Sequence, residues 1–316
     1  MIPVVGPDAI RPYLNIMRLI PAAEQALRAI SDGSAQAPVY VLHPNELADM
    51  HVKSATLPGC PIFTVKMAGW SQVLADRDES ASSGMIAVFD SETCKPLALL
   101  HDDHLISDYR TAAAGALVAK LFVPAEARSA LIVGTGTQAR LQAEALLAVC
   151  TIKTLHVWGR DRAKAGELCR SLGALQTGVT VQIADDLSAS VAWADVIVTA
   201  TGAKDPLIQA GWIRPGQHIT CVGSDDTTKC EIDPAILKDA EVFVDAKASA
   251  LKYGVSARAI SAKLLCEEAL TEIGSVLTRD PGNRQATTVA CLSGLGVQDL
   301  TTVNAFWAEL ASTATG

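Results

Sequence analysis

The stretch LIVGTGTQARLQAEALL, residues 131–147, constrains the fold more than any other part of the chain. An apolar run leads into three small residues in a GxGxxA frame, Gly134, Gly136 and Ala139, and a helix-like run follows. In a strand–turn–helix unit the first glycine permits a tight turn, the second lets a pyrophosphate approach the backbone, and the third small residue lets helix and strand pack closely. The pattern predicts a dinucleotide site, and a glycine corner without a ligand is the alternative.

The pattern of predicted secondary structure changes near residue 112. Upstream, the runs APVYVL, PIFTVKMA and GMIAVFD read as short strands between turns. Downstream, apolar strands alternate with helix-like runs, which predicts βαβ units and a parallel sheet. We therefore expect an α/β protein with a Rossmann-type doubly wound domain over residues 113–290. A discontinuous α+β domain over 1–112 is expected to receive the tail, 291–316, as a returning segment.

The bulk composition narrows the function classes. Hydrophobic residues make up 49% of the 316 positions, charged residues 19%, and the net charge is −8. This charge argues against nucleic-acid binding, which needs cations to neutralise phosphates. No apolar run approaches the roughly 20 residues of a membrane span. The eight cysteines show no CxxC or Cys/His spacing, and no secretory signal is visible, so we expect no zinc site and a reducing, cytoplasmic location.

The end of the second strand of a Rossmann unit selects between nicotinamide cofactors. NAD sites usually carry Asp or Glu there for the ribose 2′-hydroxyl, whereas arginine suits a 2′-phosphate. This chain reads VWGRDR, with Arg160 and Arg162 on either side of Asp161. The sequence favours NADP(H). Asp161 keeps NAD(H) possible, and both arginines could instead be solvated surface charges.

Four segments in order, HLISDYRTAAAGALVAKLF, ALIVGTGTQARLQAEAL, VGSDDTTKCEID and GLGVQDL, resemble the ornithine cyclodeaminase/μ-crystallin family. The resemblance covers roughly residues 36–305. It implies a Rossmann domain beside a substrate and dimerisation domain, a homodimer, and NAD(P)-dependent chemistry on amino or imino acids.

The resemblance also implies roles for individual residues. Lys66 matches a lysine that faces the substrate, and Asp225 matches the catalytic aspartate. Further positions match residues at the cofactor: Arg110, Gly134, Gly136, Thr137, Gln138, Thr201, Val222, Gly223, Lys229, Ser293 and Gly294. Taken alone, Lys66 reads as a surface lysine, Arg110 as an exposed helix start, and Asp225 as a turn residue or helix cap, with Asp226 able to replace it by a one-residue slip.

The residue types suit hydride transfer to an imine. Such a transfer needs a polarised C=N bond, and a carboxylate such as Asp225 can accept and return a proton or activate water. An ammonium such as Lys66 can bind a substrate carboxylate or a leaving oxygen. Asp225 follows the apolar run HITCVG, which predicts a place at the carboxyl edge of the sheet, where doubly wound folds bind ligands.

Two positions depart from the family pattern. Tyr40 stands where many members have an arginine that clamps the substrate carboxylate, and a tyrosine offers no fixed charge. Lys53 stands where the ornithine cyclodeaminases carry a glutamate, thirteen residues before the substrate lysine. Lys53 repels a substrate ammonium but could bind a carboxylate. We therefore assign Tyr40 and Lys53 as substrate-binding candidates and favour a reductase or dehydrogenase of a 2-imino, cyclic imino or 2-oxo acid.

Two alternatives stay open: an ornithine cyclodeaminase, a lyase that makes proline and ammonia, and a non-catalytic NADP-binding protein of the μ-crystallin kind. Two other groups of polar residues are expected to serve the fold rather than to bind a ligand. A solvated loop is favoured over a metal site for His101, Asp102, Asp103 and His104. Asp299 reads as a helix-start residue.

Overall fold

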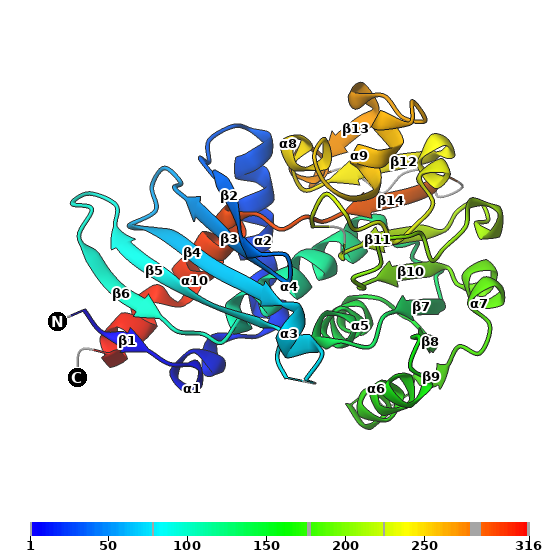
Figure 1. The fold of residues 1–316 in the computed structure, drawn as a ribbon, viewed down its shortest axis with the longest axis horizontal. Coiled ribbons are helices and arrows are strands. Elements are labelled where there is room, and N and C mark those ends of the chain that lie inside the picture. The colour runs from blue at the N-terminus through cyan, green and yellow to red at the C-terminus, as the bar shows by residue number, and fades with distance from the viewer. Residues whose placement is uncertain (1, 78, 176–177, 224, 279–285, 315–316) are drawn as a thin grey trace. The chain divides into compact units, whose positions relative to one another are not determined.

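The computed structural model describes residues 2–77, 79–175, 178–223, 225–278 and 286–314, and it divides the chain into two compact units (Figure 1). Unit 1 comprises Met1–Ala113 and Leu295–Gly316, and unit 2 comprises Ala114–Gly294. The first boundary falls inside one long helix, α4 (Leu105–Phe122), whose Ala-rich sequence has high helix propensity.

Unit 1 contains a six-stranded sheet in the order β1-β6-β5-β4-β3-β2. The strands are β1 (Val4–Val5), β2 (Val39–Asn45), β3 (Ala48–Ala55), β4 (Ile62–Ser71), β5 (Ser82–Asp90) and β6 (Pro96–Leu100). All neighbours are antiparallel except β1 and β6. The three upstream runs predicted as strands are confirmed as β2, β4 and β5. Its helices are α1 (Pro7–Ile10), η1 (Arg11–Tyr13), α2 (Ile16–Ser31), α3 (Gln72–Ala75), the first half of α4, and α10 (Gly296–Ala314).

One face of this sheet is buried and the other is not. Side chains alternate along β4, with Ile62, Thr64, Lys66 and Ala68 on the buried face. The C-terminal helix α10 packs on β3, β4 and α2. Residues near the end of the chain therefore complete the core that the first hundred residues begin.

Unit 2 contains an eight-stranded sheet, parallel throughout, in the order β13-β12-β14-β11-β10-β7-β8-β9. The strands are β7 (Ser129–Val133), β8 (Thr154–Trp158), β9 (Thr180–Ile183), β10 (Val196–Thr199), β11 (His218–Cys221), β12 (Ala240–Val244), β13 (Leu270–Glu272) and β14 (Thr287–Cys291). The helices are α5 (Thr137–Val149), α6 (Arg162–Leu175), α7 (Leu187–Trp193), η2 (Ala210–Trp212), η3 (Pro234–Asp239), α8 (Lys247–Ala250), α9 (Gly254–Ser261), η4 (Glu267–Ala269) and η5 (Ile273–Val276).

The strand order reverses at β7, which lies between β10 and β8. This reversal is the switch point at which doubly wound sheets bind ligands beyond the carboxyl ends of their strands. The central strands are buried on both sides and are almost entirely aliphatic, as parallel sheets require. The predicted fold class, a Rossmann-type parallel sheet with an additional α+β unit, is confirmed.

The glycine turn joins β7 to α5 at this switch point. Gly134 has a φ of +135°, and a Cβ added there would lie 2.4 Å from the backbone oxygen of Ala200. Gly136 is the N-cap of α5, has a φ of −84°, and would place an added Cβ in open space. The first glycine is therefore required by the fold. The second leaves room beside the N-terminus of a 13-residue helix that no side chain caps.

No helix among the described residues is both long enough and apolar enough to cross a membrane.

We predict opposite stability effects for alanine at the two glycines. Gly134→Ala is expected to lower the free energy of unfolding by about 2 kcal/mol or more, because the new methyl collides with backbone and the φ is strained. Gly136→Ala is expected to change it by less than about 1 kcal/mol. Urea denaturation followed by circular dichroism measures both. Equal losses in the two variants would contradict this assignment of the turn.

Candidate active site

Unit 1 holds a buried ion cluster on the inner face of its sheet. Lys66 on β4 lies with its Nζ 2.8 Å from Oδ2 of Asp299, and Arg110 on α4 lies with its Nε 3.1 Å from Oδ1 of the same carboxylate. Lys66 is 4% exposed, Arg110 7% and Asp299 0%. Since charged side chains are almost never buried without a partner, the carboxylate and the two cations depend on one another.

Two further side chains hold the cations in place. The hydroxyl of Ser107 accepts hydrogen bonds from Lys66 Nζ at 3.0 Å and from Arg110 Nη2 at 3.2 Å. The Oε1 of Gln298 accepts from Arg110 Nη1 at 3.3 Å. An ammonium has three N–H donors. With Asp299 and Ser107 as partners, Lys66 keeps one N–H for another acceptor.

Lys53 adds a third cation beside the cluster. It lies on β3 directly opposite Lys66 in the antiparallel register, so the two side chains share a face, and it is 8% exposed. Unit 1 thus gathers three buried cations, Lys53, Lys66 and Arg110, against two buried acids, Asp299 and Asp102. The cations outnumber the acids, and an anion is the ligand that such an excess favours.

The charges shift the pKa values in the cluster. The pKa of Lys66 is lowered to about 8, chiefly by burial; Asp299 opposes this shift, while Arg110 and Lys53 contribute to it. Burial alone would raise the pKa of Asp299, but Lys66 and Arg110 outweigh burial and hold that pKa below its usual range. At neutral pH Lys66 is therefore an ammonium and Asp299 a carboxylate. The ammonium loses its proton when the pH rises past about 8.

The structure revises the expectations for several unit 1 residues. Lys66 is buried rather than a surface lysine, and Arg110 bonds to Asp299, Gln298 and Ser107 rather than standing exposed at a helix start. Asp299 does lie in the first turn of α10, but interpreting it as a helix-start residue alone was wrong, because it is the counter-ion of two cations.

Tyr40 is not brought to this cluster. The register pairs Tyr40 with Val52, which neighbours Lys53 and therefore points to the opposite face, and Tyr40 is 66% exposed. Its expected role in substrate binding stays a prediction that the geometry of unit 1 does not support.

In unit 2, a buried glutamate ties together the loops that follow β10 and β11. Glu231 accepts hydrogen bonds from the Thr199 hydroxyl, from the backbone and hydroxyl of Thr201, and from the backbone of Gly223. A Cβ added at Gly223 would lie 2.1 Å from the Thr201 oxygen. Two of the predicted cofactor residues, Thr201 and Gly223, are thus held by one carboxylate, and a third, Val222, donates its backbone N–H to the carbonyl of Thr199. Sequence reasoning missed Glu231, although it lies two residues beyond Lys229.

In the loop after Gly223, the neighbouring aspartates Asp225 and Asp226 differ in exposure and in their hydrogen bonds. Asp226 Oδ1 accepts from the backbone of Thr228 and Lys229 and from the Thr228 hydroxyl, so it closes the turn. The side chain of Asp225 is 43% exposed, and its Oδ1 lies 2.7 Å from Lys229 Nζ. Of the two neighbouring aspartates, Asp225 is the one whose carboxylate the turn leaves at the surface of unit 2.

A second buried carboxylate braces the turn after β14. Asp245 is 1% exposed and accepts from the backbones of Ser293 and Gly294 and from the Ser293 hydroxyl, with donor–acceptor distances of 2.7–2.9 Å. Gly294 has a φ of +77°, which favours glycine. Ser293 and Gly294 were both predicted at the cofactor, and their hydrogen bonds to Asp245 hold this turn in one conformation.

The tip of β8 presents arginine rather than a free acid. Arg160 is exposed, and no hydrogen bond or ion pair to it is found within the described parts of the chain. Arg162 pairs with Asp185 on the surface. Asp161 accepts from the backbones of Ala163 and Lys164, so its Oδ1 caps the start of α6. The remaining candidates, Thr137 and Gln138, open α5 directly after Gly136.

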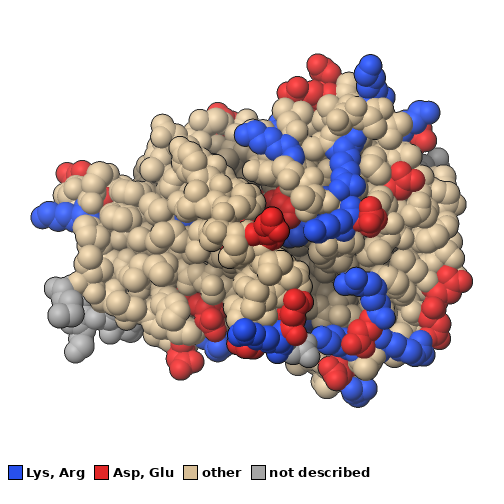
Figure 2. All heavy atoms as spheres, viewed as in Figure 1, with Lys and Arg blue, Asp and Glu red and all other residues tan. Residues whose placement is uncertain are grey.

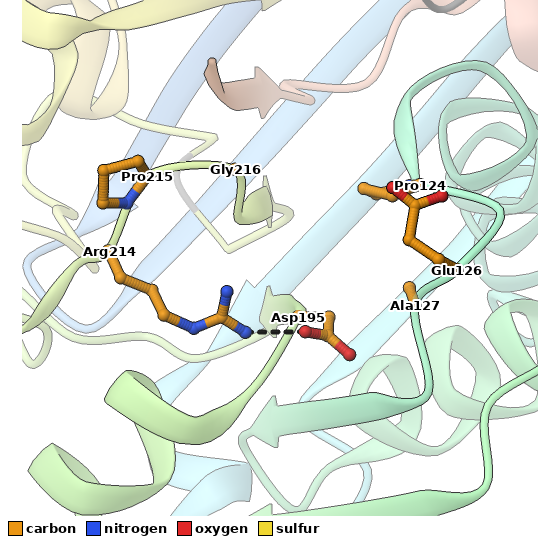
Figure 3. Close-up of a pocket in the computed structure, with 7 residues that line it drawn as sticks. All are labelled: Pro124, Glu126, Ala127, Asp195, Arg214, Pro215 and Gly216. Carbon is orange, nitrogen blue, oxygen red and sulfur yellow. Dashed lines mark hydrogen bonds and ion pairs between the residues drawn. The ribbon is translucent and has the colours of Figure 1, made fainter. Parts of the chain in front are cut away.

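A hollow of about 320 Å³ lies at the other edge of the unit 2 sheet (Figure 3). Its lining residues precede β7, β10 and β11, and they are Pro124, Glu126, Ala127, Asp195, Arg214, Pro215 and Gly216. It therefore opens at the amino ends of the strands, away from the edge that binds ligands in this fold.

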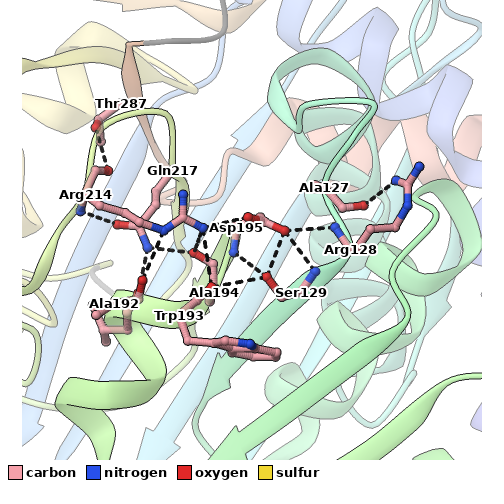
Figure 4. A network of polar contacts seen from close by, with 11 residues as sticks. Ala127, Arg128, Ser129, Ala192, Trp193, Ala194, Asp195, Arg214, Gln217 and Thr287 are labelled. Atoms are coloured by element: carbon pink, nitrogen blue, oxygen red, sulfur yellow. Dashed lines mark hydrogen bonds and ion pairs between the residues drawn. The ribbon is translucent and has the colours of Figure 1, made fainter.

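The polar groups at this hollow serve the fold. Arg214 donates to the carbonyls of Ala192 and Ala194 and pairs with Asp195 at 2.6 Å, and Gln217 donates to the carbonyl of Ala194 (Figure 4). These bonds satisfy the carbonyls at the end of α7, which otherwise lack partners.

The turn before α4 shows no metal site. Asp102 accepts from the backbone of Ile106, and His104 lies 3.2 Å from Asp108, so both act within the helix start. Across the residues that the structure describes, no group of three or more His, Cys, Asp or Glu side chains could hold a metal ion.

The chain is 35% identical over 288 residues to an uncharacterised cyclodeaminase of Sinorhizobium fredii, covering 89% of this chain and 87% of that protein. It is 31% identical over 252 residues to the Δ1-pyrroline-2-carboxylate reductase of Colwellia psychrerythraea, covering 78% of each. The iminosuccinate reductase of Paracoccus denitrificans, solved with NAD+, superposes with a TM-score of 0.87 at 25% identity, covering 99% of this chain and 97% of that one. The sequence profile of the ornithine cyclodeaminase/mu-crystallin family matches residues 8–313, and the chain belongs to this family.

Proposed function

We propose that the protein is an NAD(P)-dependent oxidoreductase that reduces an imino acid, or runs the reverse oxidation of an amino acid. The observation that carries this proposal is the buried cluster of unit 1, whose excess of positive charge around Lys66 suits a substrate carboxylate. The Rossmann sheet of unit 2 supplies the second part, a glycine turn of the dinucleotide-binding kind.

The glycine turn fits a nicotinamide nucleotide. The open space beside Gly136 leaves room for a pyrophosphate, and the N–H groups at the start of α5 can donate to its oxygens. Thr137 and Gln138 follow at the same helix end, and Glu231 and Asp245 brace the loops that carry Thr201, Gly223, Ser293 and Gly294. A bound nicotinamide supplies or accepts the hydride.

On the substrate side, the ammonium of Lys66 has one N–H left for a carboxylate oxygen. Arg110, which the family resemblance assigns to the cofactor, is proposed here for the substrate carboxylate, because Asp299 holds it beside Lys66. Lys53 reinforces the preference for an anion. Asp225 is the proposed proton donor and acceptor, because its carboxylate is accessible while Asp226 is used by the turn. The protonated imine that results is the more reactive hydride acceptor.

The same charges disfavour the cyclodeaminase alternative. A diamino acid brings a side-chain ammonium, and the cations of unit 1, which outnumber its buried acids, would repel it. The non-catalytic alternative does not account for an ion cluster buried at the cost of desolvating four charged groups.

The first prediction for this function is net cofactor consumption. With Δ1-pyrroline-2-carboxylate or Δ1-piperideine-2-carboxylate, the absorbance of NADPH or NADH should fall in proportion to imine added. Lys66→Met should lower kcat/KM by about 10²-fold or more while still binding nucleotide. Conversion of ornithine to proline without net cofactor change, at ordinary enzyme rates, would favour the cyclodeaminase instead.

For the cofactor, we propose a preference for NADP(H) over NAD(H). Arg160 at the tip of β8 is exposed and suited to a bidentate contact with a 2′-phosphate. Asp161, the only acid within the GRDR segment, has an oxygen committed to capping α6. Arg162 is a second candidate whose guanidinium would have to leave Asp185.

The matching prediction separates the two arginines. Arg160→Ala should raise the KM for NADPH by about 10-fold or more and leave the KM for NADH nearly unchanged, because only NADPH carries the 2′-phosphate. Arg162→Ala is the matched control and should have the smaller effect. Initial rates at saturating imine measure both constants. An equal rise for the two nucleotides would contradict the assignment.

We also propose that the protein forms a homodimer through the exposed face of the unit 1 sheet. The cross-strand row Tyr40, Val52, Met67 and Met85 crosses four strands on that face, with Leu42 in the next row. Tyr40, Leu42 and Met85 are 66%, 55% and 37% exposed. Figure 2 shows few charged side chains over these strands. Exposed apolar faces of this kind are typical of interfaces between protein chains. The cytoplasmic location expected from the sequence stays a prediction.

This surface yields a prediction on oligomeric state. Wild-type protein should sediment at twice the 33.1 kDa chain mass. Met85→Asp should convert it to a monomer, because a carboxylate would be buried without a partner between two apolar faces. Leu175→Asp replaces a 60% exposed leucine on α6 of unit 2 and should leave the dimer intact. A monomeric wild type, or dissociation by Leu175→Asp alone, would contradict this interface.

A further inference from the structure

We propose that Asp299 is a positioning residue for the reaction, which aims the Lys66 ammonium and the Arg110 guanidinium at the substrate carboxylate. This inference rests on the proposed function. In this proposal Asp299 acts through Lys66 and Arg110 and does not itself contact the substrate or the cofactor.

The geometry gives each oxygen of Asp299 a separate task. Oδ2 lies 2.8 Å from Lys66 Nζ, and Oδ1 lies 3.1 Å from Arg110 Nε. The two cations come from different elements, β4 and α4, and the carboxylate comes from a third, α10. One fully buried side chain therefore sets the distance between the two groups that hold the substrate.

The hydroxyl of Ser107 completes the arrangement. It accepts from both cations, at 3.0 Å from Lys66 Nζ and 3.2 Å from Arg110 Nη2. A neutral hydroxyl can orient the donors but cannot offset their charge. Among the described side chains of unit 1 that contact the two cations, Asp299 alone carries a negative charge.

The charges around Lys66 determine what loss of Asp299 would do. Burial is the largest cause that lowers the pKa of Lys66, Arg110 on α4 and Lys53 on β3 lower it further, and Asp299 on α10 is the group that raises it. Asp102, before α4, interacts with Asp299 but accepts its hydrogen bond from the backbone N–H of Ile106. Neutralising Asp299 therefore leaves two cations and burial unopposed.

The sign of the pH effect follows from this balance. The Lys66 pKa of about 8 should set the basic limb of the kcat/KM profile, since the ammonium binds the substrate carboxylate only while protonated. In Asp299→Asn the pKa of Lys66 falls, so the ammonium is lost at lower pH. We expect the basic limb to move down by about one to two pH units, the shift that loss of one charge-assisted hydrogen bond produces.

The test measures kcat/KM for imine reduction from pH 5 to 10 in wild type, Asp299→Asn and Asp299→Ser, with circular dichroism and nucleotide binding to confirm folding. Asp102→Asn is the matched control, because it removes a buried carboxylate of the same unit without touching Lys66. Its basic limb should stay within about 0.3 units of wild type. Activity of the Asp299 variants should recover toward low pH, which a damaged fold would not do.

Each outcome of this test either supports or overturns the proposed role of Asp299. A basic limb shifted downward in either folded Asp299 variant, and not in Asp102→Asn, supports the proposal. Unshifted limbs, or equal shifts in the control, overturn it, and so does failure of both Asp299 variants to fold, because Asp299 would then serve the fold alone. If wild-type protein reduces no imino acid at any pH while still binding nucleotide, the proposed function fails instead.

Discussion

The site in unit 1 depends on one buried ionic contact, the carboxylate of Asp299 between Lys66 and Arg110. Two cations on the inner face of a sheet would repel each other and lose their hydration, and neither cost is tolerable without a partner of opposite sign. Asp299 meets that requirement from the last helix of the chain. The return of the C-terminal segment from Leu295 to unit 1 therefore does more than close the core, because it supplies the buried counter-ion of Lys66 and Arg110.

The excess of charge in the cluster has a functional consequence. A balanced set of two cations and two anions would be a structural ion network with little affinity for a further ligand. Lys53 tips the balance toward cations, and Lys66 has an N–H without an assigned acceptor in the cluster. A ligand with a carboxylate would reduce this excess. In the proposed function, the same excess disfavours a substrate with a side-chain ammonium, for which a glutamate in the place of Lys53 would be favourable.

Much of the fold and part of the site could be predicted from the sequence. The GxGxxA turn and the alternating strands indicated a Rossmann sheet, because the positive φ of the turn at Gly134 favours glycine and leaves a signal in the sequence. Lys66 and Asp225 were identified by the family resemblance. Asp299 and Glu231 were missed, because an acid near a helix start or in a loop looks solvated until tertiary packing buries it. Tyr40 was placed by analogy with an arginine, and only the strand register shows that it points to the other face of the sheet.

The role of the unit 1 cluster in substrate binding can be measured in a crystal structure with NADP+ and L-proline, the product of Δ1-pyrroline-2-carboxylate reduction. We expect the proline carboxylate within hydrogen-bond distance of Lys66 Nζ and the Arg110 guanidinium, with the Asp299 contacts to both cations retained. A proline carboxylate bound elsewhere, with no contact to Lys66 or Arg110, would show that the cluster does not bind substrate.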